Sequence, residues 1–513
     1  MDNFITRHED RIIGVLHGFD RMLFRGTFRS ISYVQGMAKF LARQGVLLKD
    51  FAAFARRCTA VLTEHAQRVS QDAGRPLMYL ASSSARKEDI ATAIAQRDRV
   101  ERGLVCVLTC VEPCMSFDIH RNRHHKRLEL VSRPRKCKHF YFYFMDPTFG
   151  LMHVRLQSWL PCDVQVCING RSYLERQMMG AGMMYDKADN CFTRIDDVDR
   201  AQRMLDHLGT RDWGKTLDRL VRPLMPLRRC GGLLSKVFGY YWTMRQHEYA
   251  TDVMFKDAAS LEAIYPDLCR HAIERLSSPD ILRFLGKKPV GRFNREVTSD
   301  LKRRVEGVRI KHCLGGNSIK MYDKQQTLLR IETTLNDPSM FRVFRRAEGD
   351  DQSPLLWRPL RKGVADMKRR IEISRAANER YLEALSVVGS TTPVHRVLDP
   401  VSQPARCGPA RPLRPIAPDD AALFKAIMRG EHLLDSFANR DVQKHLFPTQ
   451  ARDACEQRRR SNHVAHRLRM LRHHGLIRKV PRRHRYRITA KGHTIITTAL
   501  TLRQANHTML KAA

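Results

Sequence analysis

The sequence contains no apolar run that approaches the length of about 20 residues that a helix needs to cross a bilayer. Its first residues, Met1-Asp2-Asn3, do not open a secretory signal peptide. Hydrophobic residues make up 43% of the chain and charged residues 28%, which is typical of a soluble globular protein. We therefore expect a cytoplasmic protein without a membrane partner.

Several common signatures of catalytic and nucleotide-binding sites are also missing. The sequence has neither a G-x-x-x-x-G-K-[ST] phosphate loop nor a G-x-G-x-x-G dinucleotide fingerprint, which argues against an ATPase or a dinucleotide-dependent enzyme. A G-x-S-x-G nucleophile turn and an H-E-x-x-H zinc helix are absent as well.

Acidic residues are scarce relative to basic ones. The chain has 53 Asp and Glu against 91 Lys and Arg, which gives a formal net charge of +38, and the basic residues are spread along its whole length. Such a field favours a polyanionic partner, because binding releases the counterions condensed on it. We expect a nucleic acid, with DNA favoured and RNA possible, and a nucleoid-associated location in a bacterial cell; a membrane surface is the weaker alternative.

The cysteines do not suggest a disulfide scaffold, because there are 13 of them and they are scattered. Cys110, Cys114, Cys137 and His139 could together complete a tetrahedral zinc site, but zinc ligands usually come in closer cysteine pairs. Cys110 also lies in the apolar run GLVCVLTCV, where a cysteine acts as a small hydrophobic residue. A structural zinc is therefore not expected.

The pattern of elements predicts an α/β and α+β multidomain protein, with a basic mixed-sheet body, a helical insertion and a C-terminal winged helix. Residues 200–285 are predicted to be helical, and residues 290–345 to return to strands. The predicted units are an α/β domain (1–116), a strand-rich basic region (117–200), a helical segment with a β-meander and a long helix (201–388), a Pro- and Arg-rich linker (389–418) and the winged helix (419–513).

Residues 439–491 have the element order of a winged helix-turn-helix, which they resemble: a short helix, a longer helix, and two strands around a basic turn. Val464, Leu468 and Leu471 recur at i, i+4 and i+7 and predict one apolar stripe, and Gly475 follows where a helix would end. One alternative is that the long helix is a basic helix exposed to solvent in an α+β subdomain. Another is that the winged helix contacts protein or RNA, as some winged helices do. The residues predicted to bind nucleic acid here are Arg458, Arg459, Arg460, His463, Arg467, Arg472, Arg482, Arg483 and Arg485.

A second specific segment spans residues 308–337, VRIKHCLGGNSIKMYDKQQTLLRIETTLND. Gly315-Gly316-Asn317 is a strong hairpin turn, so the segment predicts a β-meander. Alternation puts Lys320, Tyr322 and Lys324 on one face and Asp323 on the other, and it puts Arg330 and Glu332 on a common face.

This stretch resembles the YDK…R-hydrophobe-E signature of rolling-circle replication initiators and relaxases of plasmids and phages. The resemblance implies a tyrosine that attacks a DNA phosphate, assisted by Mg²⁺ or Mn²⁺. If the roles in that signature apply to this sequence, Tyr322 is the nucleophile or a tyrosine that supports the strand, and Lys324 contacts a phosphate. Glu332 is then a metal ligand, Asp323 is a second candidate ligand, and Lys320 contacts nucleic acid. The sequence departs from this pattern at His153-Val154-Arg155, where many such enzymes have a His-hydrophobe-His metal pair.

Two alternatives stay open for this segment. It could be an ordinary core meander whose Tyr, Lys and Glu form surface pairs. Carboxylates from separate strands could instead hold two metal ions in a transposase-like or nuclease-like site. No spacing selects a triad from the candidates, which are Asp20, Glu112, Asp118, Asp252 and Asp300.

The chain as a whole also resembles a family of bacterial hypothetical proteins, through segments such as GFDRMLFRGTFRS, HVRLQSWLP, ATDVMF and NSIKMYDK, and this resemblance implies little about activity. We predict a nucleic-acid enzyme of mobile-element type, such as a DNA-nicking replication initiator or a transposase-like phosphoryl transferase. The alternative is a non-catalytic DNA-binding regulator or a protein that binds structured RNA. The oligomeric state is left open by the sequence.

Overall fold

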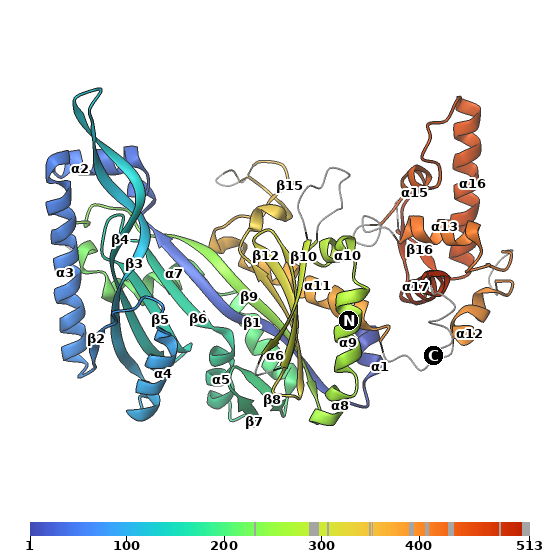
Figure 1. Cartoon of the computed structure of the whole chain (residues 1–513), viewed down its shortest axis with the longest axis horizontal. Helices are drawn as coiled ribbons and strands as arrows, with labels where there is room; N and C mark the ends of the chain where they lie inside the picture. Colours follow the sequence, from blue (N-terminus) through green and yellow to red (C-terminus); the bar gives the residue numbers. More distant parts are fainter. Residues whose placement is uncertain are drawn as a thin grey trace.

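The protein is built around one long twisted sheet, with helices on both faces (Figure 1). This computed structural model describes residues 1–229, 232–286, 297–304, 307–347, 350, 352–388, 394–405, 410–428, 436–481 and 484–504. The mixed α/β character predicted from the sequence is confirmed. Within the described residues, no helix is both long enough and apolar enough to cross a membrane.

Eleven strands in the described ranges form the main sheet. Strands β2 and β3 pair in parallel, and the other neighbouring strands pair antiparallel. From edge to edge the order is β10 (Val297–Arg304), β11 (Gly307–Leu314), β12 (Asn317–Lys324), β13 (Leu328–Leu335), β9 (Tyr241–Phe255), β1 (Ile12–Thr27), β6 (Val164–Asn169), β5 (Gly150–Gln157), β4 (Arg127–Asp146), β3 (Gly103–Asn122) and β2 (Leu77–Tyr79).

Strand β1 lies in the middle of this sheet, where it pairs with β6 on one side and with β9 on the other. The boundary predicted between residues 116 and 117 falls inside β3, and β9 joins the predicted third unit to the first one. Strands from all three predicted units before residue 388 therefore join one sheet. Sequence position could not show this, because β1 and β9 pair although they are more than 200 residues apart.

Strand β9 corrects the prediction that residues 200–285 are helical. Its sequence, YWTMRQHEYATDVMF, is rich in aromatic and β-branched residues that favour strands, and it lies between true helices whose periodicity dominated the segment. Its last residues, from Tyr249 to Phe255, are all buried, as expected for a strand at the centre of a covered sheet.

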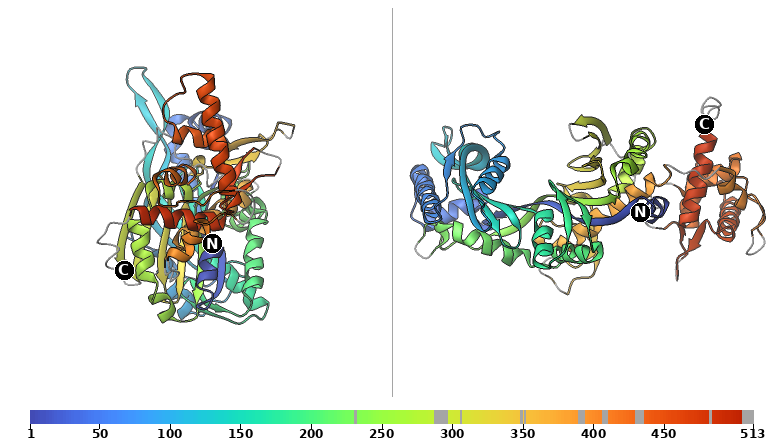
Figure 2. Two further views of the ribbon diagram at one scale, coloured as in Figure 1. Left: turned by 90° about the vertical axis from the view of Figure 1, so that its right-hand side faces the viewer. Right: turned by 90° about the horizontal axis from the view of Figure 1, so that it is seen from below.

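Helix α11 (Met367–Leu385) covers one face of β9 and β13, where Tyr381, Leu382 and Leu385 enter a core shared with α9 and α10. A larger core lies at the other end of the sheet, where α3 packs against β3 (Figures 1 and 2). Other helices of this part are α1 (Asp2–Arg7), α2 (Val34–Arg43), α3 (Phe51–Asp72), α4 (Lys87–Arg97), α5 (Gly170–Gly180), α6 (Val198–Asp206), α7 (Trp213–Val221), α8 (Ala258–Glu262), α9 (Tyr265–Glu274) and α10 (Ser278–Phe284). Two small hairpins are β7 (Tyr185–Ala188) with β8 (Cys191–Ile195), and β14 (Arg342–Arg345) with β15 (Leu356–Pro359).

The C-terminal residues form a unit with its own core at one end of the molecule (Figure 1). The predicted apolar stripe is present, since Val464, Leu468 and Leu471 are fully buried, and Gly475 ends the long helix with a φ of +73°. The predicted order of helices and strands is also present. The elements are α12 (Val394–Leu398), α13 (Pro418–Ile427), α15 (Asn439–Leu446), α16 (Ala454–His473), β16 (Ile477–Lys479), β17 (Tyr486–Ile488) and α17 (Ala490–Gln504).

The predicted linker, residues 389–418, is folded in part. Leu398, Val401 and Leu413 are buried in the core of the C-terminal unit, and α12 contacts α17. Burial of these apolar side chains outweighs the Pro- and Ser-rich composition on which the prediction rested. Residues 389–393 and 406–409 lie outside the described residues.

Candidate functional site

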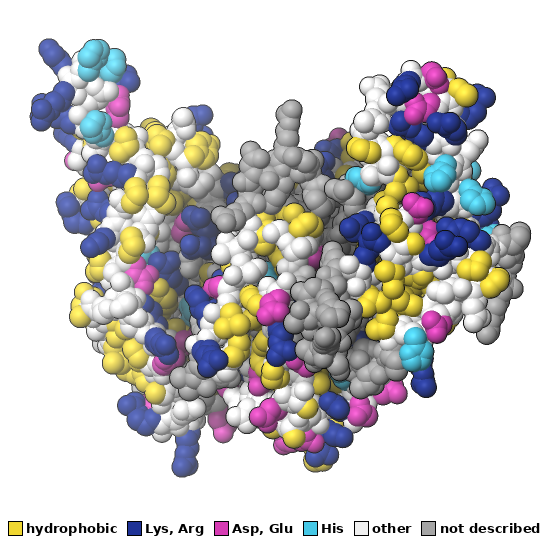
Figure 3. Space-filling model, turned by 45° about the vertical axis from the view of Figure 1, so that its right-hand side comes forward, with side chains coloured by type: hydrophobic (Ala, Val, Ile, Leu, Met, Phe, Trp, Pro, Cys, Tyr) yellow, Lys and Arg dark blue, Asp and Glu magenta, His cyan; other side chains and the backbone are white. Residues whose placement is uncertain are grey.

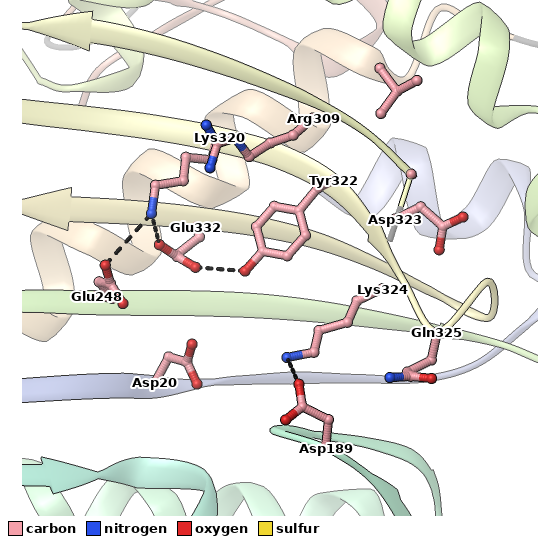
Figure 4. A pocket seen from close by; sticks show the side chains of 12 residues that line it. Asp20, Asp189, Glu248, Arg309, Lys320, Tyr322, Asp323, Lys324, Gln325 and Glu332 are labelled. Carbon is pink, nitrogen blue, oxygen red and sulfur yellow. Dashed lines mark hydrogen bonds and ion pairs between the residues drawn. The ribbon is translucent and has the colours of Figure 1, made fainter. Parts of the chain in front are cut away.

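The meander predicted around Tyr322 consists of β11, β12 and β13, and it forms one wall of a cavity of about 300 Å³ (Figure 4). The register places Lys320 opposite Glu332 and Tyr322 opposite Arg330. These side chains therefore lie on a common face of the sheet, as alternation predicts. Residues that line the cavity are Asp20, Asp189, Glu248, Gly307, Val308, Arg309, Lys320, Tyr322, Asp323, Lys324, Gln325 and Glu332.

Three carboxylates from neighbouring strands meet in this cavity. Asp20 comes from β1, Glu248 from β9 and Glu332 from β13, and one carboxylate oxygen of each lies within 4.8 Å of the others. Asp20 occupies a β-bulge, since the pairing with β9 passes from Phe19 to Arg21 and leaves Asp20 without an opposite residue. A bulge re-aims the side chain that it carries, and bulges are common next to active sites.

Tyr322 and Lys320 both contact the buried Glu332. The Tyr322 hydroxyl donates a hydrogen bond of 2.7 Å to Oε2, and Lys320 Nζ lies 2.5 Å from Oε1 and 3.6 Å from Glu248. Burial alone would raise the pKa of Glu332, but Lys320 and the Tyr322 hydroxyl outweigh it and hold that pKa below its usual value. Burial raises the pKa of Tyr322 well above its ordinary value, so the phenol is un-ionised at neutral pH.

A fully buried ion network supports the floor of the cavity. Arg330 lies 2.5 Å from Asp252 and 3.2 Å from Asp20, and Arg171 from α5 lies 2.7 Å from Asp252. Asn190, in the turn of the β7–β8 hairpin, donates a hydrogen bond to the second oxygen of Asp20. The position of Asp20 is therefore fixed from two directions by elements distant in the sequence.

Carboxylates outnumber cations in the direct ion contacts of this cluster. Asp20, Glu248, Asp252 and Glu332 face Lys320, Arg330 and Arg171, and Arg309 and Lys324 also line the cavity. Burial, reinforced by the neighbouring carboxylates, raises the pKa of Asp20 and of Glu248. A divalent cation would stabilise these two carboxylates in their ionised form, and carboxylate oxygens are the ligands that Mg²⁺ and Mn²⁺ prefer. The donor set Asp20, Glu248 and Glu332 thus fits such an ion.

The structure corrects part of the predicted site. Asp323, predicted as a metal ligand, points away from the three carboxylates because alternation along β12 turns it to the other face (Figure 4). Lys320, predicted as a contact of nucleic acid, is only 15% exposed and is engaged by Glu332. Lys324 remains at the cavity, where it lies 2.9 Å from Asp189.

Sequence reasoning missed Glu248 and Asp189 and could not choose among the other acidic residues. Glu248 was hidden because β9 was predicted as helix, although Glu248 and Asp252 alternate correctly for one face of a strand. Glu112 belongs to a different cluster, where it pairs with Lys87 and Arg155. Asp118 pairs with Arg133, and Asp300 lies in β10 outside the carboxylate cluster.

In the C-terminal unit, the predicted nucleic-acid residues fall into two groups. Arg458, Arg459 and Arg472 are exposed and form no hydrogen bond or ion pair with another described residue. Figure 3 shows Lys and Arg side chains gathered on the face of this unit that is turned to the viewer. His463 is also exposed, with its ring against Phe447.

The other arginines serve the fold of the unit. Arg460 pairs with Glu456, Arg467 lies 2.9 Å from the buried Asp420, and Arg485 donates hydrogen bonds to Ser436. For these three, the prediction of a free phosphate contact is not met, because tertiary partners already use the guanidinium. Arg482 and Arg483 lie outside the described residues.

No protein-family model matches the chain, and neither a curated protein nor a solved structure matches it.

Proposed function

We propose that the cavity around Tyr322 is the active centre of a metal-dependent enzyme that breaks or exchanges phosphodiester bonds in nucleic acid, of the DNA-nicking or replication-initiating kind. One observation carries this proposal. A tyrosine hydroxyl, three carboxylates and the ammonium of Lys324 converge on one cavity in a chain of net charge +38. Nucleophile, metal ligands and phosphate-binding cations are the parts that such chemistry needs.

Glu332 is the proton acceptor in this proposal. An un-ionised phenol is a poor nucleophile, and Glu332 Oε2, at 2.7 Å, is within direct proton-transfer distance of the Tyr322 hydroxyl. As the tyrosine oxygen bonds to phosphorus, its proton passes to Glu332. The bond from phosphorus to the leaving sugar oxygen breaks, and that oxygen takes a proton from solvent.

The remaining residues hold and neutralise the phosphate. Lys324 is close enough to the cavity mouth to exchange Asp189, which is 68% exposed, for a phosphate oxygen. Asp20, Glu248 and Glu332 would hold the divalent cation, whose chemistry is to polarise the phosphate and stabilise the charge that develops on it. Arg330 and Arg171 do not contact the phosphate in this proposal. They are positioning residues, because their ion pairs hold Asp20 and Asp252 in place.

We further propose that the C-terminal unit, in which residues 419–513 are predicted as a winged helix, docks duplex nucleic acid. The order of helices and strands and the exposed, unpartnered Arg458, Arg459 and Arg472 of the described chain support this role. The C-terminal unit would then contribute affinity, while the chemistry belongs to the main sheet.

The test is covalent capture on labelled single-stranded and supercoiled DNA with Mg²⁺ or Mn²⁺. We expect nicking and a denaturation-resistant protein–DNA adduct, both lost in Tyr322→Phe. Tyr79→Phe is the matched control, because Tyr79 is 62% exposed and lies on the edge strand β2. The proposal is wrong if the protein neither nicks DNA nor forms an adduct in the presence of Mg²⁺ or of Mn²⁺.

A different outcome would favour the carboxylate-only version of the site. If DNA is nicked without an adduct, and if nicking survives Tyr322→Phe but is lost in Asp20→Asn and Glu248→Gln, then water is the nucleophile and the three carboxylates act as in transposase-like enzymes. The non-catalytic alternative, a regulator or structured-RNA binder, is favoured by the close contact of Lys320 with Glu332, which already occupies one carboxylate. In that case the protein binds nucleic acid and no metal supports cleavage.

A further inference from the structure

Strands β3 and β4 form a long arm that leaves the main sheet. Pairing of β4 with β5 ends at His139, and pairing of β3 with β2 ends at Thr109. Beyond these points no further strand of the described chain pairs with either one, so a two-stranded ribbon continues to the turn between Asn122 and Arg127 (Figure 1). The root of the arm packs on the body, since Phe117 and Leu130 are buried in the larger core and Trp159 Nε1–H donates to the carbonyl oxygen of Phe117. The residues near the turn are mostly exposed, and isolated two-stranded ribbons are marginally stable in water.

Three metal-ligating side chains gather at this root. Cys114 Sγ lies 2.9 Å from Cys137 Sγ, and Cys137 Sγ lies 4.0 Å from His139 Nε2. Cys137 and His139 are two residues apart on β4 and therefore share a face, and the register brings Cys114 of β3 to the same face. One ligand atom of each of the three residues lies within 4.8 Å of the others. The spacing along the sequence argues against zinc, but the β-ladder supplies the proximity that the spacing lacks.

The histidine is oriented as a metal ligand. Its Nδ1–H donates a hydrogen bond of 3.1 Å to the carbonyl oxygen of Cys137, and Nε2 is the ring nitrogen that contacts Cys137 Sγ, at 4.0 Å. A hydrogen bond from the second ring nitrogen to a backbone carbonyl is the usual way in which proteins orient a metal-bound histidine.

A metal ion at this place would take the position of the thiol hydrogens that now lie between these side chains. Its ligands would be the sulfur atoms of Cys114 and Cys137 and the Nε2 nitrogen of His139, and binding would release the thiol protons to solvent.

A disulfide is the competing outcome for two thiols this close, since the sulfur atoms lie 2.9 Å apart and a disulfide bond is about 2.05 Å long. Cys137 lies opposite Glu112, and Cys114 opposite Arg135, so the two cysteines are diagonal neighbours in the β-ladder. The two outcomes are distinguished by whether the cysteines of the metal-loaded protein are recovered as thiols or as a disulfide.

We propose that Cys114, Cys137 and His139 bind one thiophilic divalent cation, Zn²⁺ in the first place, as a clip that fastens β3 to β4 where the arm leaves the sheet. Cys110, the next cysteine on this face, is not the fourth ligand, because it donates its thiol hydrogen to Glu112 at 3.2 Å. This inference does not depend on the proposed activity, since the clip lies on different strands from the cavity around Tyr322.

The test uses the full chain, purified with a thiol reductant, loaded with Zn²⁺ or Co²⁺ and then dialysed. We expect about one equivalent of tightly held metal per chain. The Co²⁺ form should show thiolate-to-metal charge transfer and the visible bands of tetrahedral cobalt. Both signals should be lost in Cys114→Ser and Cys137→Ser and kept in Cys110→Ser, the matched control on the same face of β3.

A second measurement detects the clip through the arm itself. Arg121, Arg123 and Arg127 at the tip are exposed sites for trypsin. Chelation of the metal should accelerate cleavage there several-fold in the parent protein and leave the already faster cleavage of Cys137→Ser unchanged. The proposal is overturned if no metal is retained beyond that of Cys114→Ser, if Cys110→Ser loses it equally, or if Cys114 and Cys137 are recovered as a disulfide from the metal-loaded protein.

Discussion

Replacing Lys320 by methionine tests whether the carboxylates at the cavity form a buried, under-neutralised cluster. The substitution keeps the length of the side chain and removes the charge 2.5 Å from Glu332 and 3.6 Å from Glu248. Loss of one partner of a buried ion pair costs about 3–5 kcal/mol. Because Lys320 is 15% exposed, we expect the lower end, about 3 kcal/mol at pH 8.

The dependence on pH follows from the direction of the pKa shifts. In the parent protein the pKa of Glu332 is held low, so its stabilising contribution is present above the unfolded-state pKa and is lost only as the pH falls through the folded-state value. Without Lys320, the pKa of Glu332 rises with burial, and proton uptake relieves the buried charge as the pH falls. One such proton is worth at most about 1.4 kcal/mol per pH unit, so the deficit should shrink as the pH falls from 8 to 6, by no more than about 2.7 kcal/mol for this proton. Loss of Lys320 also raises the pKa of Glu248 further, because the ammonium lowers it in the parent protein, so proton uptake by Glu248 adds to the same dependence on pH. The raised pKa of Asp20 is present in both proteins.

The assay is urea unfolding followed by tryptophan fluorescence. The four tryptophans lie before residue 388, so the signal reports on the main sheet and its neighbours and not on the C-terminal unit. Lys324→Met is the matched control, since its partner Asp189 is 68% exposed and such a pair is worth at most about 1 kcal/mol. Mn²⁺ should stabilise Lys320→Met more than the parent protein, because a cation restores the missing charge. The reasoning is refuted if Lys320→Met costs no more than Lys324→Met, or if its deficit stays constant from pH 8 to pH 6.

Further substitutions test the other parts of the proposal. Gly170→Ala should destabilise the protein and abolish any nicking, because the new Cβ would lie 1.9 Å from the carbonyl oxygen of Phe19, beside the bulge at Asp20. Gly180→Ala, at the other end of α5, is the control. A Cβ there has no atom within 4 Å, so this substitution should be tolerated in the same assays. Arg467→Met should loosen the C-terminal unit by about 2 kcal/mol, measured as faster hydrogen exchange in α13 and α16, because Asp420 loses one of its two arginine partners. Joint replacement of the three unpaired arginines by alanine should leave hydrogen exchange unchanged and weaken binding to duplex DNA. If each arginine contacts one phosphate, the slope of log affinity against log salt should fall by up to about 2.7. An unchanged slope would show that this face of the C-terminal unit does not contact DNA. These arginines are Arg458, Arg459 and Arg472.

Local pattern was sufficient for the elements whose periodicity is strong. The apolar stripe of α16, the glycine that ends it and the turn at Gly315-Gly316 depend on neighbours in the chain, and the structure has all of them where they were expected. The alternation that puts Lys320, Tyr322 and Glu332 on one face also needs only the period of a strand. Strand β9 was predicted as helix because its local pattern is weak. Near Phe255 it is buried on both faces, so it lacks the alternation of apolar and polar residues that marks a half-exposed strand.

The sequence by itself determined the excess of positive charge, the mixed α/β composition and the tyrosine-bearing meander. Only the tertiary structure decided which acidic residues accompany Tyr322, because Asp20, Glu248 and Glu332 come from strands that are adjacent in the sheet and far apart in the chain. It also decided which arginines are free, since a guanidinium engaged by a buried carboxylate, such as that of Arg467 with Asp420, looks the same in sequence as an exposed one. Charge and periodicity are local properties of a chain, whereas pairing across β1 and the ion contacts that follow from it exist only once the sheet has formed.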